Sequence, residues 1–247
     1  MRIASAAVLV LGSVAAVAGG VAGAAGRTLG ARSAALHVVA TGVDGTGVDG
    51  ATRDLGPDDP CRDVVTTADG SCLLVQGSDG PLLVTVEPGP PIDDAFADRP
   101  WVVQVLASGA APGTWVPALS TRPDGADPGP IYAGVTVRAA DVTGDGHDEV
   151  VIGYRNSGTG DILELDVVGW SNGRVRVLAD DVVYKGSVRL RPGSIVEWTP
   201  VYRSHDANCC PTWIARDVVT FRDGKFHVRR AARVRIEKAD VPPSDIG

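Results

Sequence analysis

Oxygen-bearing residues alternate along one short acidic segment of the chain, in a pattern suited to holding a calcium ion. The segment reads Asp141-Val-Thr-Gly-Asp-Gly-His-Asp-Glu149. Calcium takes roughly six to eight oxygen ligands, and a tight loop supplies them from alternate residues as it winds round the ion. Gly146 permits the sharp turn after the third ligand. The expected ligands are the side chains of Asp141, Thr143, Asp145 and Glu149 and the main-chain carbonyl of His147.

The residues after this loop separate it from an EF-hand. An EF-hand needs a carboxylate at its twelfth position and an exiting helix, whereas the twelfth position here is Ile152. Residues 150–154, Val-Val-Ile-Gly-Tyr, favour a strand instead. The alternative to a calcium loop is a plain hairpin turn, since Asp and Gly are common in turns.

A strand, a D-x-T-x-D-G-x-x-E loop and a second strand, over residues 134–155, resemble the calcium-binding hairpin of FG-GAP and VCBS-type repeats. The resemblance implies one bound Ca²⁺ with a structural role. The third position of that pattern is usually Asp or Asn, so Thr143 implies weaker affinity.

The N-terminus predicts export. Met1-Arg2 precede an uncharged run that ends in small residues, which is typical of a secretory signal peptide over residues 1–26. Residues 3–26 are also long enough to span a bilayer, so an uncleaved membrane anchor is the alternative. The net charge of -7 argues against nucleic acid as a partner. We therefore expect a secreted protein or one in the extracytoplasmic cell envelope.

Four cysteines follow the export segment, and in an oxidising compartment we expect disulfides. Spacing leaves open two arrangements, a Cys61–Cys72 bridge with a Cys209–Cys210 bridge or two parallel crosslinks between those segments. Zinc is a third interpretation, without C-x-x-C spacing to support it. The run Asp-Ala-Asn-Cys-Cys-Pro-Thr at 206–212, followed by 221–226, resembles secreted or envelope-attached proteins of actinobacterial type and unknown function. That resemblance, over residues 186–228, favours a self-contained Cys209–Cys210 pair.

The rest of the chain predicts an all-β protein. Short β-branched runs are separated by Asp-Gly, Asn-Gly and Pro-Gly turns, and helical periodicity is scarce. Only one segment matches the loop pattern and no self-repeat is visible, so we expect an antiparallel sandwich or an open, propeller-like sheet stack rather than a complete propeller. The expected organisation is a signal or anchor (1–26), a flexible, disordered linker (27–60), a small β subdomain (61–110), an irregular connection (111–130), a β domain with the calcium-type loop (131–238) and a tail (239–247).

These observations favour a non-catalytic, exported β-domain, stabilised by disulfides and one calcium ion, that acts as an envelope binding or structural module. An extracytoplasmic hydrolase acting on cell-wall or carbohydrate material, with Asp206 and its neighbours at its site, is the competing class. A thiol–disulfide redox module using Cys209 and Cys210 is the third. The partner is not identifiable from the sequence.

Overall fold

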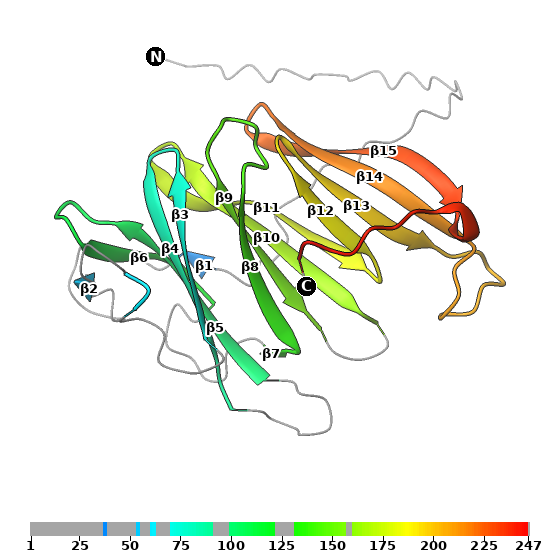
Figure 1. Ribbon diagram of the computed structural model, residues 1–247, viewed down its shortest axis with the longest axis horizontal. Coiled ribbons are helices and arrows are strands. Elements are labelled where there is room, and N and C mark those ends of the chain that lie inside the picture. The colour runs from blue at the N-terminus through cyan, green and yellow to red at the C-terminus, as the bar shows by residue number, and fades with distance from the viewer. Residues whose placement is uncertain are drawn as a thin grey trace, which may run out of the picture.

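The computed structural model describes residues 37–38, 53–54, 60–62, 70–90, 99–121, 131–156 and 160–246, and these form an all-β protein (Figure 1). The predicted signal or anchor segment and most of the predicted linker lie outside the described residues. The strands are β1 (His37–Val38), β2 (Arg53–Asp54), β3 (Ser71–Gly77), β4 (Gly80–Pro88), β5 (Arg99–Ser108), β6 (Thr114–Ser120), β7 (Ile131–Tyr132), β8 (Gly134–Ala140), β9 (Glu149–Arg155), β10 (Ile162–Ser171), β11 (Arg174–Tyr184), β12 (Ser187–Arg191), β13 (Ser194–Val201), β14 (Trp213–Arg222) and β15 (Lys225–Arg235), followed by the 3₁₀ turn η1 (Ile236–Lys238).

The strands form three antiparallel sheets that do not close into a barrel. Sheet 1 has the order β1-β6-β5-β4-β3, with β2 paired to β6 and β7 paired to β5. Sheet 2 contains β8 to β11 and sheet 3 contains β12 to β15, each as a meander of neighbours in sequence. β1 and β2 lie within the range predicted as linker.

Two-residue turns connect several of these strands, as the sequence predicts. Asn172-Gly173 joins β10 to β11, and Asp223-Gly224 joins β14 to β15. All four residues have positive φ, between 52° and 72°. This backbone suits the right-handed twist of the flanking strands, and Asn-Gly and Asp-Gly adopt it at low cost.

Sheet 2 is the middle layer of the stack. Along β9, Val150 and Ile152 pack with the apolar residues of sheet 1, whereas Val151 packs with those of sheet 3. All three side chains are 0% exposed. Strand residues alternate between the two faces of a sheet, so a middle layer must be apolar on both faces. The continuous Val-Val-Ile run of β9 therefore follows from its position. The members of the core that sheet 2 shares with sheet 3 are Val142, Val151, Leu163, Leu165, Val167, Val183, Val188, Ile195, Val219, Phe226, Val228 and Ile246.

β6 lies in the segment for which the sequence predicts an irregular connection. Pro, Gly and Asp dominate residues 111–130, and Pro117 argues against a central strand. β6 nevertheless pairs with β5 across a register shift, and its Trp115 and Leu119 are buried. Pairing with a buried neighbour and burial of two large side chains outweigh the local composition.

Candidate functional site

The loop of residues 141–148 connects β8 to β9 as a hairpin within sheet 2. Glu149 is the first residue of β9, and its side chain turns back to the start of the loop. Its Oε2 accepts hydrogen bonds from the N–H groups of Val142 (2.9 Å) and Thr143 (3.0 Å), and its Oε1 accepts one from the Thr143 hydroxyl (3.0 Å). The residue is only 5% exposed. Burial raises the pKa of the Glu149 carboxyl, against the lowering effect of the hydrogen bonds from Thr143.

Asp141 organises the opposite side of the loop. Its Oδ1 accepts the Gly144 N–H at 2.6 Å, and its Oδ2 accepts the Gly146 N–H at 3.1 Å. Both glycines have positive φ, which bends the backbone round the carboxylate. The third acidic residue, Asp145, accepts the N–H of His147 at 2.9 Å.

The loop supplies the kinds of oxygen ligand that calcium prefers. Hydroxyl, carbonyl and carboxylate oxygens are all present, and a carboxylate oxygen that accepts one hydrogen bond keeps a second lone pair. In the described part of the chain, no three His, Cys, Asp or Glu side chains converge on one point where they could hold a metal ion. The side chains of the predicted ligands therefore have to move closer together to share one ion.

The loop also contacts both neighbouring sheets, which sequence reasoning did not anticipate. The carbonyl of Asp141 accepts the N–H of Gly193, in the turn between β12 and β13 of sheet 3, at 2.8 Å. At the other end of the loop, the N–H of Asp148 donates to the carbonyl of Gln76 in β3 of sheet 1, at 3.3 Å. One acidic loop thus bridges all three layers. The only feature of the sequence that could have indicated this contact is that Gly144 and Gly193 both occur in turns.

Replacing Gly144 with alanine is expected to destabilise the protein more than replacing Gly146. Both positions have positive φ, so each substitution carries a backbone cost of about 1 to 2 kcal/mol. A Cβ on Gly144 would lie 3.1 Å from the Cα of Gly193, whereas nothing lies within 4 Å of a Cβ on Gly146. We expect about 1 kcal/mol of additional loss for Gly144→Ala, measured by urea unfolding. Equal losses would mean that the contact with the β12–β13 turn contributes nothing.

The structure pairs Cys61 with Cys72 and Cys209 with Cys210. This is the first of the two arrangements that the spacing left open. Cys61 and Cys72 pack against a small core on sheet 1 formed by Leu83, Leu106 and Trp115. The loop that carries the second disulfide leaves both of its cysteines exposed.

Two residues hold the loop that carries Cys209 and Cys210. Asp206 accepts the N–H groups of Arg203 (2.8 Å) and Thr212 (2.9 Å) and the Thr212 hydroxyl (2.5 Å). Asn208 is clamped by the Lys185 ammonium group, which donates to its carbonyl oxygen at 2.8 Å and to its Oδ1 at 3.0 Å. The exposed disulfide therefore lies on a loop that the hydrogen bonds of Asp206 and Asn208 hold in place.

The hydrogen bond from the Thr212 hydroxyl, followed by that from the Arg203 N–H, lowers the pKa of Asp206 to about 2. General acid–base catalysis works best with a pKa near the operating pH. Asp206, which the hydrolase interpretation places at the site together with its neighbours, braces the loop and is ionised at neutral pH.

Comparisons with models of known protein families, with curated proteins and with solved structures find no match to this chain. Among the residues that the structure describes, no helix has the length and hydropathy needed to cross a membrane.

Proposed function

We propose that this chain is an exported β-domain that acts as an envelope binding or structural module, and that one calcium ion in the loop of residues 141–149 stabilises it. The proposal rests on the hydrogen bonds that this loop makes with sheet 1 and with sheet 3. Because the loop is hydrogen-bonded to Gln76 of sheet 1 and to Gly193 of sheet 3, an ion that fixes the loop also fixes the order of the layers.

The environment of Glu149 supports a cation at this position. A buried carboxylate loses its hydration, and a nearby positive charge compensates that loss. Its carboxylate accepts hydrogen bonds from Val142 and Thr143, which are neutral donors, and it is repelled by the nearby charge of Asp145. Calcium would supply the missing positive charge, held by the side chains of Asp141, Thr143, Asp145 and Glu149 and the carbonyl of His147.

The disulfides support the extracytoplasmic location. Both described pairs are of the kind that persists in oxidising compartments and is rare in the cytosol. An all-β stack held by disulfides and a structural ion suits a protein that works outside the cell, where binding surfaces lie on loops and sheet edges supported by a rigid core.

Calcium is expected to raise the melting temperature of the purified protein. An ion at about ten times its Kd adds about 1.4 kcal/mol, or about 3 to 6 °C for a domain of this size. Asp145→Ala is expected to abolish the gain. Asp79→Ala, in the exposed β3–β4 turn, is the matched control and should keep the gain. If chelator leaves the melting curve of the unmodified protein unchanged, the calcium proposal is wrong.

Glu149→Gln sharpens this test because its effect has opposite signs with and without the ion. The folded-state pKa of Glu149 is raised, so without calcium the ionised carboxylate costs stability, and the cost grows as pH rises from the usual range of a glutamate through the raised pKa. The glutamine variant should lose that dependence and be the more stable protein at neutral pH in chelator. In calcium it should be the less stable one. A variant less stable in both conditions would mean that the carboxylate serves only as a hydrogen-bond acceptor.

A further inference from the structure

Three arginine side chains gather at one tryptophan on sheet 3. The guanidinium carbons of Arg203, Arg233 and Arg235 lie 5.2, 5.5 and 5.6 Å from the ring centre of Trp213. Trp213 begins β14, Arg233 and Arg235 end β15, and Arg203 belongs to the loop that also carries the exposed disulfide. We call these four residues the Trp213 cluster.

The register of β14 and β15 places the cluster on one face of the sheet. Trp213 is directly opposite Arg235, and Arg233 lies two residues further along its strand. Paired residues of antiparallel strands share a face, as do alternate residues of one strand. Arg203 is oriented through its own backbone, because its N–H donates to Asp206.

An ion pair between a buried aspartate and a half-exposed arginine separates the cluster from the core on the same face. Val219 and Val228 are opposite each other and belong to the core shared with sheet 2. The next pair toward the cluster is Asp217 and Arg230, whose side chains are joined by two hydrogen bonds of 2.7 and 2.9 Å. Beyond that pair, Arg233 and Arg235 are exposed. On this face the core shared with sheet 2 ends at Asp217–Arg230. Beyond that pair, β14 contributes the buried Ala215 and the half-buried Trp213, and the arginines of β15 face solvent.

The charges of the cluster are largely uncompensated. Arg235 lies 3.6 Å from Glu237, but both side chains are more than half exposed, which makes the ion pair weak. Within the described ranges of the chain, no ion pair joins Arg203 or Arg233 to a carboxylate. A protein with a net charge of -7 therefore concentrates unpaired guanidinium groups at one end of one sheet.

We propose that the Trp213 cluster binds the oxyanion groups of an anionic polymer chain, either phosphodiesters or uronic carboxylates. Stacking on an indole holds a guanidinium plane while its N–H edge stays available, and that edge matches phosphate and carboxylate oxygens in a bidentate manner. The inference rests on the proposed function as an envelope module and names its binding surface.

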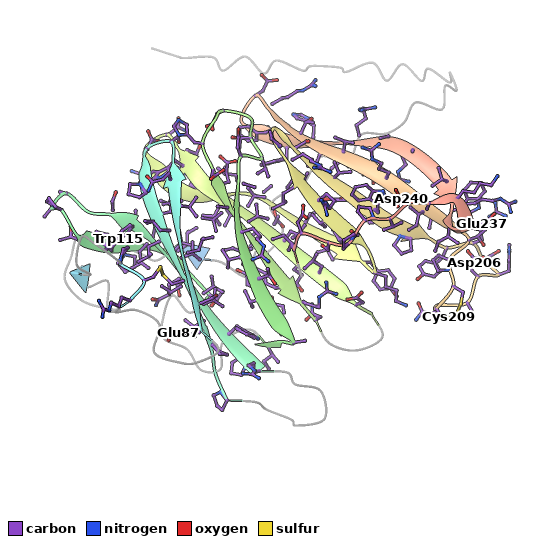
Figure 2. All side chains as sticks on the ribbon, viewed as in Figure 1. Glu87, Trp115, Asp206, Cys209, Glu237 and Asp240 are labelled. Atoms are coloured by element: carbon purple, nitrogen blue, oxygen red, sulfur yellow. A yellow bond between two sulfur atoms is a disulfide. The ribbon has the colours of Figure 1, made fainter. Side chains whose placement is uncertain are left out.

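The surrounding charges favour a single chain over a flat anionic membrane. Asp206, Glu237 and Asp240 lie at the same end of sheet 3 as the cluster (Figure 2). A bilayer of anionic headgroups would be pressed against these carboxylates, and like charges repel. A single polymer chain is narrow enough to follow the arginines without covering the whole end of the sheet.

The test measures binding of the full-length protein to immobilised linear polyphosphate, to polygalacturonate and to vesicles of phosphatidylglycerol and phosphatidylcholine, at low and at physiological salt. The unmodified protein is expected to bind one or both polymers, more weakly as salt rises. Arg233→Gln combined with Arg235→Gln should weaken that binding at least tenfold, and Arg203→Gln should weaken it independently. Polyphosphate against polygalacturonate distinguishes phosphate from carboxylate as the preferred group.

Arg229→Gln is the matched control, because Arg229 is an exposed arginine of the same strand on the opposite face. It should change polymer binding less than twofold. Equal losses in this control, no binding to either polymer, or stronger binding to vesicles than to polymers would each overturn the inference. Melting curves of the same samples in calcium and in chelator test the proposed function separately, so either can fail while the other stands.

Discussion

Truncating Ile152 to alanine is expected to lower the free energy of unfolding by about 2 to 5 kcal/mol, the usual cost of a cavity in a well-packed core. Ile152 is 0% exposed and belongs to the core between sheets 1 and 2. Its neighbour Val151 is equally buried in the core between sheets 2 and 3. Val151→Ala should therefore also be destabilising, which a sheet covered on one face only would not show. The measurement is chemical denaturation followed by tryptophan fluorescence.

Val182→Ala provides the control for this prediction. Val182 lies on β11 of the same sheet, but 55% of its surface is exposed. Its truncation should change stability by no more than about 0.5 kcal/mol. If either Val151 or Ile152 were as tolerant as Val182, the three-layer packing would be wrong.

Removing the two disulfides is expected to have very unequal effects. Replacing Cys61 and Cys72 together with serine should cost about 2 to 4 kcal/mol, because their bond closes a loop with a sequence separation of 11 and fixes a segment against sheet 1. The Cys209–Cys210 bond joins neighbours in sequence, so it restricts the unfolded chain little. Its double serine variant should lose about 1 kcal/mol or less.

Unfolding curves of the two double variants decide this prediction, and thiol titration shows which bond opens first in mild reductant. The Cys209–Cys210 pair is exposed and should react before the pair packed on Leu83 and Leu106. Equal stability losses would imply that the loop around Cys209 and Cys210 makes native contacts beyond the bracing by Asp206 and Asn208.

The strands and their turns were largely predictable because each depends on local chemistry. Alternating β-branched runs predicted most strands of sheets 2 and 3. Asn-Gly and Asp-Gly turns predicted the β10–β11 and β14–β15 hairpins, and the positive φ values at Asn172-Gly173 and Asp223-Gly224 agree with that prediction. β6 was not predicted because Pro117 argues against a central strand, whereas its pairing with β5, β1 and β2 stabilises it.

Contacts between residues far apart in the chain could not be predicted from the sequence. No local pattern predicted the stacking order of the sheets. The hydrogen bond between Gly193 and Asp141 joins residues about 50 positions apart, which no local pattern encodes either. Arg203 and Arg235 were visible only as basic residues until the fold brought both to Trp213. The acidic loop was found because its whole pattern lies within nine residues, 141–149.

The ion pair of Asp217 and Arg230 has an evolutionary consequence. On its face of sheet 3 it marks the end of the core shared with sheet 2, beyond which Arg233 and Arg235 are exposed. On the polymer-binding proposal, substitutions of these exposed arginines alter recognition at little cost to stability, since surface substitutions usually change stability by no more than about 0.5 kcal/mol. On the same proposal, one ancestral scaffold can diversify its targets while the sheets beneath keep their packing.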